Sequence, residues 1–343
     1  MNALLVADIG GTNARFGLIE QITGQPGKSD YAIFAPQTLK CDDYSSFGHM
    51  VQAYCDSLDV PKPRYACLAL AGPVKDNTIA MTNRKWHCSG DELASKLGFT
   101  TVKLLNDYAA LACAAPHLTG EATTTLFEAQ PDPQAPIAVL GPGTGFGIAA
   151  FIPDQYGGRV LPSEGGHVNF APTTDTEVEL LKFLLQEQQG YVSVEHLLSG
   201  SGLVKIYRAL AHIAGGSCHY WQPDQISALG LSGEDSLCRE TVQTFCNILG
   251  SVAGDKALEF YALGGVYIGG GITPRFNGFL QQTDFLTRFQ SKGGLSEFVQ
   301  RIPIHLVKTD NAALIGCAAW LQNFILAEGS CRYFELKQHR QAG

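Results

Sequence analysis

Residues 3–20 read ALLVADIGGTNARFGLIE, and this stretch decides the fold prediction. Its first residues are apolar, as expected of a buried strand, and residues 14–19 alternate like a strand that runs back beside it. The glycine pair between them, Gly10-Gly11, is typical of a tight turn. The stretch therefore predicts a β-hairpin with a glycine-rich tip.

A second stretch of the same kind, IAVLGPGTGFGIAAFI, occupies residues 137–152. Strand, glycine turn and strand follow one another in the same order, and Gly141 stands 131 residues after Gly10 (141 − 10). The two units differ too much to be a solenoid repeat. They indicate an ancient doubling of one α/β domain, and we expect both glycine tips to face a shared cleft.

The remaining elements follow from apolar runs and helical spacing. We expect strands at residues 31–36, 64–71, 102–105, 265–268 and 302–307, and helices at 47–58, 91–98, 107–115 and 310–326. The polar stretch 117–136 is interpreted as the crossing into a second domain. The predicted division is a small α/β domain of residues 1–116 plus 310–327, a large α/β domain of residues 117–309, and a frayed tail at 328–343.

Composition excludes several classes of protein. The chain has 343 residues, which suggests two domains, and its net charge of −8 shows no basic excess for binding nucleic acid. The ten cysteines form no CxxC pair, and several stand in apolar runs, which favours buried thiols in a reducing compartment. The longest apolar run, residues 312–321, is about half a membrane span. No basic region precedes Asp8, so no signal peptide is indicated. These features predict a cytoplasmic protein that binds neither nucleic acid nor membrane.

Two standard nucleotide motifs are absent from the sequence. Gly27-Lys28-Ser29 ends like a Walker A motif, but Ile22 stands where its first glycine belongs. Gly141 and Gly143 are followed by Phe146 where the dinucleotide fingerprint needs its third glycine. Any nucleotide must therefore be bound in another way.

The two glycine turns offer that other way. Glycines let a backbone approach a polyphosphate closely and direct N–H groups at it, and hydroxyl and amide side chains add donors. A carboxylate such as Asp8, at the end of its strand, suits Mg²⁺ directly or through water. The alternative to a phosphate site is a plain hairpin turn with an aspartate at its edge. Two such turns facing one another could hold a triphosphate between them, which makes the plain-turn interpretation weaker. The residues concerned are Asp8, Ile9, Gly10, Gly11, Thr12 and Asn13, with Gly143, Thr144 and Gly145 in the second turn.

Four acidic or imidazole side chains suit an acid–base or polyol site. Asp107 stands where a strand ends and a helix begins, and could accept a proton from a substrate hydroxyl; the alternative is a helix N-cap. Glu164 and His167 flank two glycines, and Glu195 stands at an expected helix start. These side chains can accept hydrogen bonds from sugar hydroxyls, or they are solvated loop residues. A zinc site is not supported, because no cysteine lies between residues 114 and 217.

Taken together, the motifs resemble those of bacterial-type ATP-dependent glucokinases. The matching segments are collinear from about residue 4 to residue 326: 8–15 (DIGGTNAR), 80–83 (AMTN), 105–108 (LNDY), 141–147 (GPGTGFG), 164–167 (EGGH), 195–200 (EHLLSG) and 269–275 (GGGITPR). The resemblance implies the actin/hexokinase-like (ribonuclease H-like) α/β fold of two domains with a cleft between them. It also implies transfer of the γ-phosphoryl group of ATP to the 6-hydroxyl of glucose, with Mg²⁺, in a cytoplasmic homodimer.

The resemblance also implies roles for individual residues. Asp107 would be the catalytic base, and needs no large pKa shift for that task. Asn106, Glu164, His167 and Glu195 would hold the sugar hydroxyls. The loop from Ala7 to Thr12 and the turn from Gly143 to Gly145 would bind the phosphates, and Gly270 and Gly271 would lie near the nucleoside. Ala7, Pro142 and Ser201 depart from the residues expected in the family, and the departures bear on ATP affinity rather than on the chemistry.

Three rivals remain at this point. One is a kinase of another hexose or of an amino sugar. Another is a catalytically silent sugar sensor on the same fold, against which an intact Asp107 argues. The last is an actin-like filament or chaperone ATPase, which has no need of Glu164, His167 and Glu195 together. Repressor-type sugar kinases share a Glu-x-Gly-His element but follow it with a cysteine-rich zinc motif that this sequence lacks.

Overall fold

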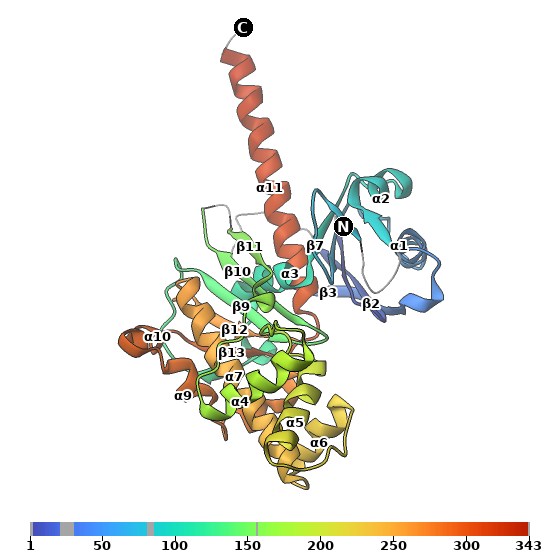
Figure 1. Cartoon of the computed structure of the whole chain (residues 1–343). Coiled ribbons are helices and arrows are strands. Elements are labelled where there is room, and N and C mark those ends of the chain that lie inside the picture. The colour runs from blue at the N-terminus through green and yellow to red at the C-terminus, as the bar shows by residue number, and fades with distance from the viewer. Residues whose placement is uncertain (1–2, 21–30, 81–85, 156, 342–343) are drawn as a thin grey trace. The chain divides into compact units, whose positions relative to one another are not determined.

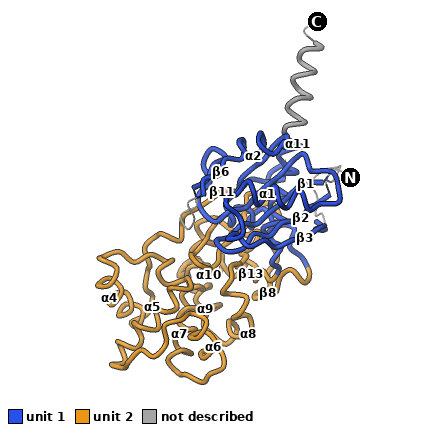
Figure 2. Tube along the Cα trace, turned by 90° about the vertical axis from the view of Figure 1, so that its right-hand side faces the viewer, with its two compact units in different colours: residues 1–119, 153–160, 309–343 blue, residues 120–152, 161–308 orange. Residues whose placement is uncertain are grey.

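A computed structural model describes residues 3–20, 31–80, 86–155 and 157–341, the last stretch by backbone alone from residue 328. The chain divides into two compact units (Figure 2). Unit 1 comprises residues 1–119, 153–160 and 309–343, and unit 2 comprises residues 120–152 and 161–308. Each unit is built around one mixed β-sheet (Figure 1).

The sheet of unit 1 has five strands in the order β3-β2-β1-β4-β7. Their bounds are β1 Ala3–Ile9, β2 Asn13–Glu20, β3 Ile33–Lys40, β4 Tyr65–Leu70 and β7 Thr101–Asn106. Strands β1, β4 and β7 are parallel, whereas β2 and β3 run antiparallel as the predicted hairpin and its neighbour. The parallel strands therefore deliver Asp8 and Asn106 to the same edge of the sheet, where α/β proteins bind ligands.

Both faces of this sheet are covered. Alternate residues of β1 point to opposite faces, so Leu5 and Ile9 join one core and Leu4 and Val6 join another. The first core includes helices α1 (Phe47–Asp56) and α2 (Gly90–Leu97), and the second includes α3 (Asp107–Ala114) and α11 (Ala312–Gln341). A small two-stranded sheet, β5 (Thr78–Ala80) with β6 (His87–Ser89), completes the unit.

Helices α3 and α11 pack at very short range. A Cβ placed on Gly316 of α11 would lie 1.7 Å from the carbonyl oxygen of Ala110 in α3, so only glycine fits this crossing. On the same helix, the thiol of Cys317 donates to the carbonyl oxygen of Ala7 at 3.7 Å, 310 residues away along the chain. Helix α11 and strand β1, from opposite ends of the chain, therefore pack in the same core.

The sheet of unit 2 has six strands in the order β11-β10-β9-β12-β13-β8. Their bounds are β8 Thr123–Phe127, β9 Ile137–Pro142, β10 Phe146–Ile152, β11 Arg159–Ser163, β12 Gly265–Ile268 and β13 Ile304–Val307. Strands β9, β12 and β13 are parallel, and β10 pairs antiparallel with β9 as the second predicted hairpin. The turns after β9 and β12 therefore lie at one edge of this sheet.

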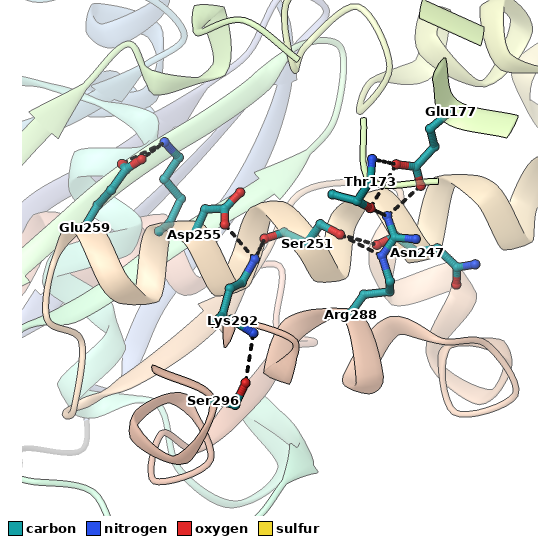
Figure 3. A network of polar contacts seen from close by, with 10 residues as sticks. Thr173, Glu177, Asn247, Ser251, Asp255, Glu259, Arg288, Lys292 and Ser296 are labelled. Atoms are coloured by element: carbon teal, nitrogen blue, oxygen red, sulfur yellow. Dashed lines mark hydrogen bonds and ion pairs between the residues drawn. The ribbon is translucent and has the colours of Figure 1, made fainter. Parts of the chain in front are cut away.

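Helices supply the rest of the large core of unit 2. They are α4 Asp175–Glu187, α5 Gly200–Ile213, α6 Pro223–Ser232, α7 Ser236–Glu259, α8 Asn277–Leu280, α9 Phe285–Gln290 and α10 Ser296–Val299. The longest of them, α7, places Phe245, Leu249 and Val252 in the core beside Leu140 and Ile268 of the sheet. Ser251 and Asp255 of this helix accept hydrogen bonds from Arg288 of α9 and from Lys292, which follows α9, and Arg288 also pairs with Glu177 of α4 (Figure 3).

The structure departs from the predicted elements in several places. The stretch 117–136 is not a bare crossing, because β8 pairs antiparallel with β13 within it. Helix α11 begins at Ala312 rather than Asp310 and continues to Gln341. Glu195 does not begin a helix, since α5 starts at Gly200 with Ser199 as its cap. Each of the nine cysteines whose side chain is described is a free thiol. Among the described residues, no helix is both long and apolar enough to cross a membrane.

Candidate active site

The hairpin of unit 1 forms an open glycine turn. The N–H of Gly10 donates to the carbonyl oxygen of Asn13 at 3.0 Å, which closes the turn. A Cβ on Gly11 would meet no atom of the chain within 4 Å, and the φ angle of Gly11 is not positive. Neither packing nor backbone conformation within the chain requires glycine there. The open space is what a closely approaching phosphate needs, so the turn fits a polyphosphate.

Asp8 lies at the base of this turn with two charged neighbours. Arg15 stands directly across the hairpin, and its guanidinium lies 3.8 Å from the carboxylate of Asp8. The same guanidinium lies 3.6 Å from the carboxylate of Asp310. Partial burial raises the pKa of Asp8, Arg15 opposes that rise, and Asp310 adds to it. Arg15 was given no role from sequence, although its register opposite Asp8 is a signal for a cross-strand ion pair.

At the end of β7, Asn106 rather than Asp107 caps the following helix. The side-chain oxygen of Asn106 accepts from the N–H groups of Tyr108 at 3.0 Å and Ala109 at 3.1 Å. Its amide nitrogen donates to the carbonyl oxygen of Gly72 at 3.1 Å. The alternative reading of Asp107 as the N-cap is therefore wrong. The side chain of Asn106 also hydrogen-bonds to the carboxyl of Asp107, which acts to lower the pKa of that group.

Asp107 is the first residue of α3, and its environment makes it a proton acceptor near neutral pH. Burial raises the pKa of the carboxyl to about 6. A hydrogen bond from the N–H of Tyr108 lowers this pKa, but the effect of burial is larger. The nearby carboxylate of Asp8 raises this pKa further. The sequence suggested no such shift. An aspartate with this pKa is ionised at pH 7 and is a stronger base than an exposed one.

In unit 2 the glycine turns after β9 and β12 lie against each other. A Cβ on Gly141 would lie 2.3 Å from the carbonyl oxygen of Gly269, so the two backbones touch at this point. The N–H of Ile272 donates to the carbonyl oxygen of Pro142 at 3.3 Å. The predicted nucleotide residues Gly143, Thr144, Gly145, Gly270 and Gly271 therefore belong to one glycine-rich edge. A Cβ on Gly271 would meet nothing within 4 Å, which again leaves space for a ligand.

Glu195 is held against the first of these turns. Its carboxylate accepts from the N–H of Phe146 at 2.7 Å, and its own N–H donates to the carbonyl oxygen of Gly166 at 2.9 Å. A Cβ on Gly145 would lie 2.5 Å from that carboxylate, so a side chain there would displace the carboxylate from its present position. Glu195 thus joins the glycine turn, through its carboxylate, to the segment that carries Glu164 and His167, through its backbone N–H.

Glu164 precedes a 3₁₀ turn, η4 (Gly165–His167), and His167 is its last residue. The imidazole Nε2 lies 4.0 Å from the Glu164 carboxylate, and both side chains are more than half exposed, at 59% for His167 and 70% for Glu164. The hydroxyl of Tyr191 donates to the carbonyl oxygen of His167, and the N–H of Val194 donates to that of Val168 at 3.0 Å. Exposed acceptors on a backbone fixed by these bonds suit the hydroxyls of a polyol. Tyr191 was not singled out from sequence, where nothing marks it.

The predicted residues thus form two sets, one in each unit. Unit 1 brings together Asp8, the glycine turn, Asn106 and Asp107, and unit 2 brings together Glu164, His167, Glu195 and both glycine turns. The segment 81–83 of the matching motifs lies outside the described residues. No group of three or more His, Cys, Asp or Glu side chains suited to a metal occurs in the described part of the chain. A magnesium ion on Asp8 would complete its shell with water and phosphate oxygens, as Mg²⁺ commonly does.

Comparison with known proteins gives a consistent result. The sequence model of the glucokinase family matches residues 5–324. A glucokinase of Saccharophagus degradans (strain 2-40) is 40% identical over 321 residues, which cover 94% of this chain and 98% of that protein.

Solved structures agree with this. The crystal structure of a glucokinase from an Antarctic psychrotroph has a TM-score of 0.86 at 41% identity, and the match covers 94% of this chain and 99% of that one. A ROK family glucokinase from Streptomyces griseus, solved with glucose and AMPPNP, has a TM-score of 0.60 at 17% identity, covering 93% of this chain and 99% of that one. At 17% identity, the similarity to the Streptomyces griseus structure shows a shared fold only.

Proposed function

The chain belongs to the glucokinase family and is an ATP-dependent hexose kinase; on that premise we propose that it phosphorylates the 6-hydroxyl of glucose with Asp107 as the catalytic base. The observation that supports the assignment is the place of Asp107, at the start of α3 directly after β7, where burial raises its pKa to about 6. The carboxylate is ionised at neutral pH and accepts the hydroxyl proton as the oxygen attacks the γ-phosphorus. In phosphoryl transfer, positioning and electrostatics supply most of the rate enhancement, and one positioned base completes them.

We propose that the two glycine turns bind the phosphates of ATP. The turn of residues 7–13 and the turn of residues 143–145 have backbones that phosphate oxygens can approach, as the open space at Gly11 supports. Gly270 and Gly271 lie beside the second turn and are exposed, which suits the nucleoside. Asp8 would hold Mg²⁺ directly or through water. The ion, when bound, neutralises charge on the phosphates, and Arg15 orients the Asp8 carboxylate.

The sugar is proposed to be bound by Asn106 and by acceptors from Glu164, His167 and Glu195. Glu195 already uses one hydrogen bond to fix its position at Phe146, and a carboxylate has capacity for more. The reaction requires that this set and Asp107 act on the same glucose molecule. We also propose a cytoplasmic homodimer, following the family.

The test is ADP release from ATP and Mg²⁺ against a panel of hexoses and amino sugars. We expect release with glucose, and its loss when glucose is omitted. Turnover with an amino sugar or another hexose in preference to glucose would favour the rival kinase, and release without any sugar would favour an ATPase. Glucose binding without ADP release would favour a silent sensor.

Two variants of Asp107 test its role directly. Asp107→Asn keeps size but cannot accept the proton, so kcat should fall by on the order of 10²- to 10⁴-fold. Helix α3 keeps its cap, because Asn106 provides it. Near-parental turnover in a folded Asp107→Asn protein would remove Asp107 from the catalytic role. Asp107→Ala should show the same loss.

A further inference from the structure

Glu195, one of the proposed sugar residues, bonds directly to the end of the proposed phosphate turn. Its carboxylate oxygen Oε2 accepts from the N–H of Phe146 at 2.7 Å, across 49 positions of the chain. Phe146 follows the turn Gly143–Gly145 and is the first residue of β10. A side chain proposed for glucose therefore also holds the backbone at the exit of a turn proposed for ATP.

The hairpin does not hold this N–H by itself. The N–H of Gly143 donates to the carbonyl oxygen of Gly145 at 2.8 Å, so these two residues form a bonded pair across the turn. Bonded and non-bonded pairs alternate along an antiparallel ladder, so the next pair, Pro142 with Phe146, is a non-bonded one. The N–H of Phe146 therefore points away from β9, and Glu195 accepts from it on that side.

Loss of this acceptor would leave a buried donor without it. Phe146 is only 5% exposed, and a buried N–H that loses its partner is costly. The exit of the turn would then have to shift to find another partner. Glycines at both ends of the turn make such a shift easy, because they have the freest backbone. The bond from Phe146 to Glu195 accordingly fixes the form of the turn.

The carboxylate of Glu195 is placed so that it can serve both sites. Its backbone is fixed separately, since its N–H donates to the carbonyl oxygen of Gly166 at 2.9 Å. The carboxylate packs against the turn itself, because a Cβ on Gly145 would lie 2.5 Å from Oε2. The bond to Phe146 uses Oε2, and the other oxygen has capacity for a hydroxyl.

We propose that Glu195 couples the two substrates, positioning the phosphate turn through one oxygen while it accepts from glucose through the other. The inference rests on the proposed roles of Glu195 in sugar binding and of the turn in phosphate binding. A sugar hydroxyl bonded to the carboxylate holds it against the turn, which lowers the cost of ordering the turn for ATP. Coupling between two binding sites is reciprocal, so bound ATP strengthens glucose binding by the same factor.

The experiment measures binding without turnover, by calorimetric titration of the non-hydrolysable analogue AMPPNP with Mg²⁺, with and without saturating glucose. In the parental protein, glucose should lower the Kd for AMPPNP by about fivefold or more. Glu195→Ala should raise the Kd for AMPPNP alone by on the order of tenfold and remove the effect of glucose. If Glu195→Ala fails to fold, Glu195→Asp, which is one methylene too short to reach Phe146, carries the same expectation.

Glu195→Gln tests whether the bond to Phe146 is the cause. The glutamine oxygen can accept from the same N–H, so the Kd for AMPPNP alone should stay within about twofold of the parental value. Equal losses of AMPPNP affinity in Glu195→Gln and Glu195→Ala would overturn the proposal.

Glu164 provides a matched control among the sugar residues. Its carboxylate is 70% exposed and has no contact with the turn among those described. Glu164→Ala should weaken glucose binding by on the order of tenfold or more, because a charge-assisted hydrogen bond is lost. It should leave the Kd for AMPPNP alone within about twofold. An equal loss of AMPPNP affinity in Glu164→Ala would contradict a specific role for Glu195.

Gly143→Ala separates this proposal from the function on which it rests. A Cβ there would lie 3.9 Å from the nearest atom, the N of Gly271, so alanine fits but occupies space that a phosphate needs. If Gly143→Ala weakens AMPPNP binding and Glu195→Ala does not, the phosphate turn stands and the role of Glu195 in it is wrong. If neither variant changes AMPPNP binding, the turn is not a phosphate site. If Glu195→Ala leaves glucose affinity unchanged, Glu195 is not a sugar residue and the coupling falls with it.

Discussion

The adjacent residues Asn106 and Asp107 have different roles. Asn106 caps helix α3, and Asp107 supplies a buried carboxylate. Asn106 uses its oxygen to cap α3 and one N–H to reach Gly72, which fixes the end of β7. Asp107 is therefore not the cap, and its carboxylate, which accepts from the N–H of Tyr108, has capacity for a further hydrogen bond. We therefore expect that Asp107 can be replaced by asparagine without loss of helix α3.

The pH dependence of turnover should report the raised pKa of Asp107. Because burial raises this pKa to about 6, kcat/KM for glucose should fall about tenfold per pH unit below pH 6 and level off above it. Steady-state kinetics at saturating ATP between about pH 5 and pH 8 measure this. The Asp107→Asn variant is the control, and its residual activity should lack this inflection. An inflection near pH 4 instead would mean that burial does not perturb the carboxyl.

The same raised pKa predicts a stability gain in Asp107→Asn. A pKa of about 6 in the folded state against 3.8 for the free group means that the native protein loses stability as pH rises through this interval. At pH 7 the buried charge costs on the order of 2–3 kcal/mol, which the amide avoids. Thermal unfolding should give a higher Tm for the variant at pH 7, and equal values near pH 4. A lower Tm at pH 7 would contradict the sign of the shift.

Motifs and residue chemistry were enough to select Asp8, Asp107, Glu164, His167 and Glu195 as candidate site residues, and their roles stay predictions. The environments of these residues could not be predicted from the sequence. The cap on Asn106, the ion pair to Arg15 and the raised pKa depend on atoms brought close by folding. A helix start containing Asn-Asp is ambiguous by one residue, since both types cap well.

At the scale of elements, the crossing of α3 and α11 depends on one missing side chain. Gly316→Ala would put a Cβ 1.7 Å from the carbonyl oxygen of Ala110, which no rotamer can relieve, because both atoms belong to backbone or Cβ positions. We expect a loss of about 1–3 kcal/mol or more in the free energy of unfolding, measured by urea denaturation.

The control for this prediction is Gly278→Ala in α8. A Cβ there would meet nothing within 4 Å, and alanine favours a helix over glycine. It should be neutral or stabilising by up to about 1 kcal/mol. Equal effects from the two substitutions would show that the helix crossing can relax.

Elements with a strong periodic pattern were predicted to within a few residues, and others were missed. The two hairpins are confirmed by the register of β1 with β2 and of β9 with β10. Strand β8 was missed because its residues, Thr123–Phe127, are mostly threonine and lie on a sheet edge, where polar residues are tolerated. Helices α4 to α10 were not assigned, although their caps, such as Thr174 and Asp235, are readable signals.

At the scale of the whole molecule, the proposed homodimer is the property to measure. The chain has a mass of 36.8 kDa, so sedimentation velocity at micromolar concentration should show a species of about 74 kDa (2 × 36.8 kDa). A single species of monomer mass across this range would contradict the proposal. The measurement is independent of activity, so it does not depend on the sugar site.

The closure of unit 1 by its last helix has a consequence during synthesis on the ribosome. Residues 1–119 emerge first, yet the core that contains Leu4 and Val6 also needs Leu314 and Leu321 of α11. About 190 residues (309 − 119) must be translated in between, which takes roughly 10–40 s at roughly 5–20 residues per second. Unit 2, nearly continuous in the chain, can fold during this interval, whereas the nascent β1 keeps an apolar face exposed. The half that carries Asp107 is thus completed last and spends the longest time open to aggregation and to chaperones.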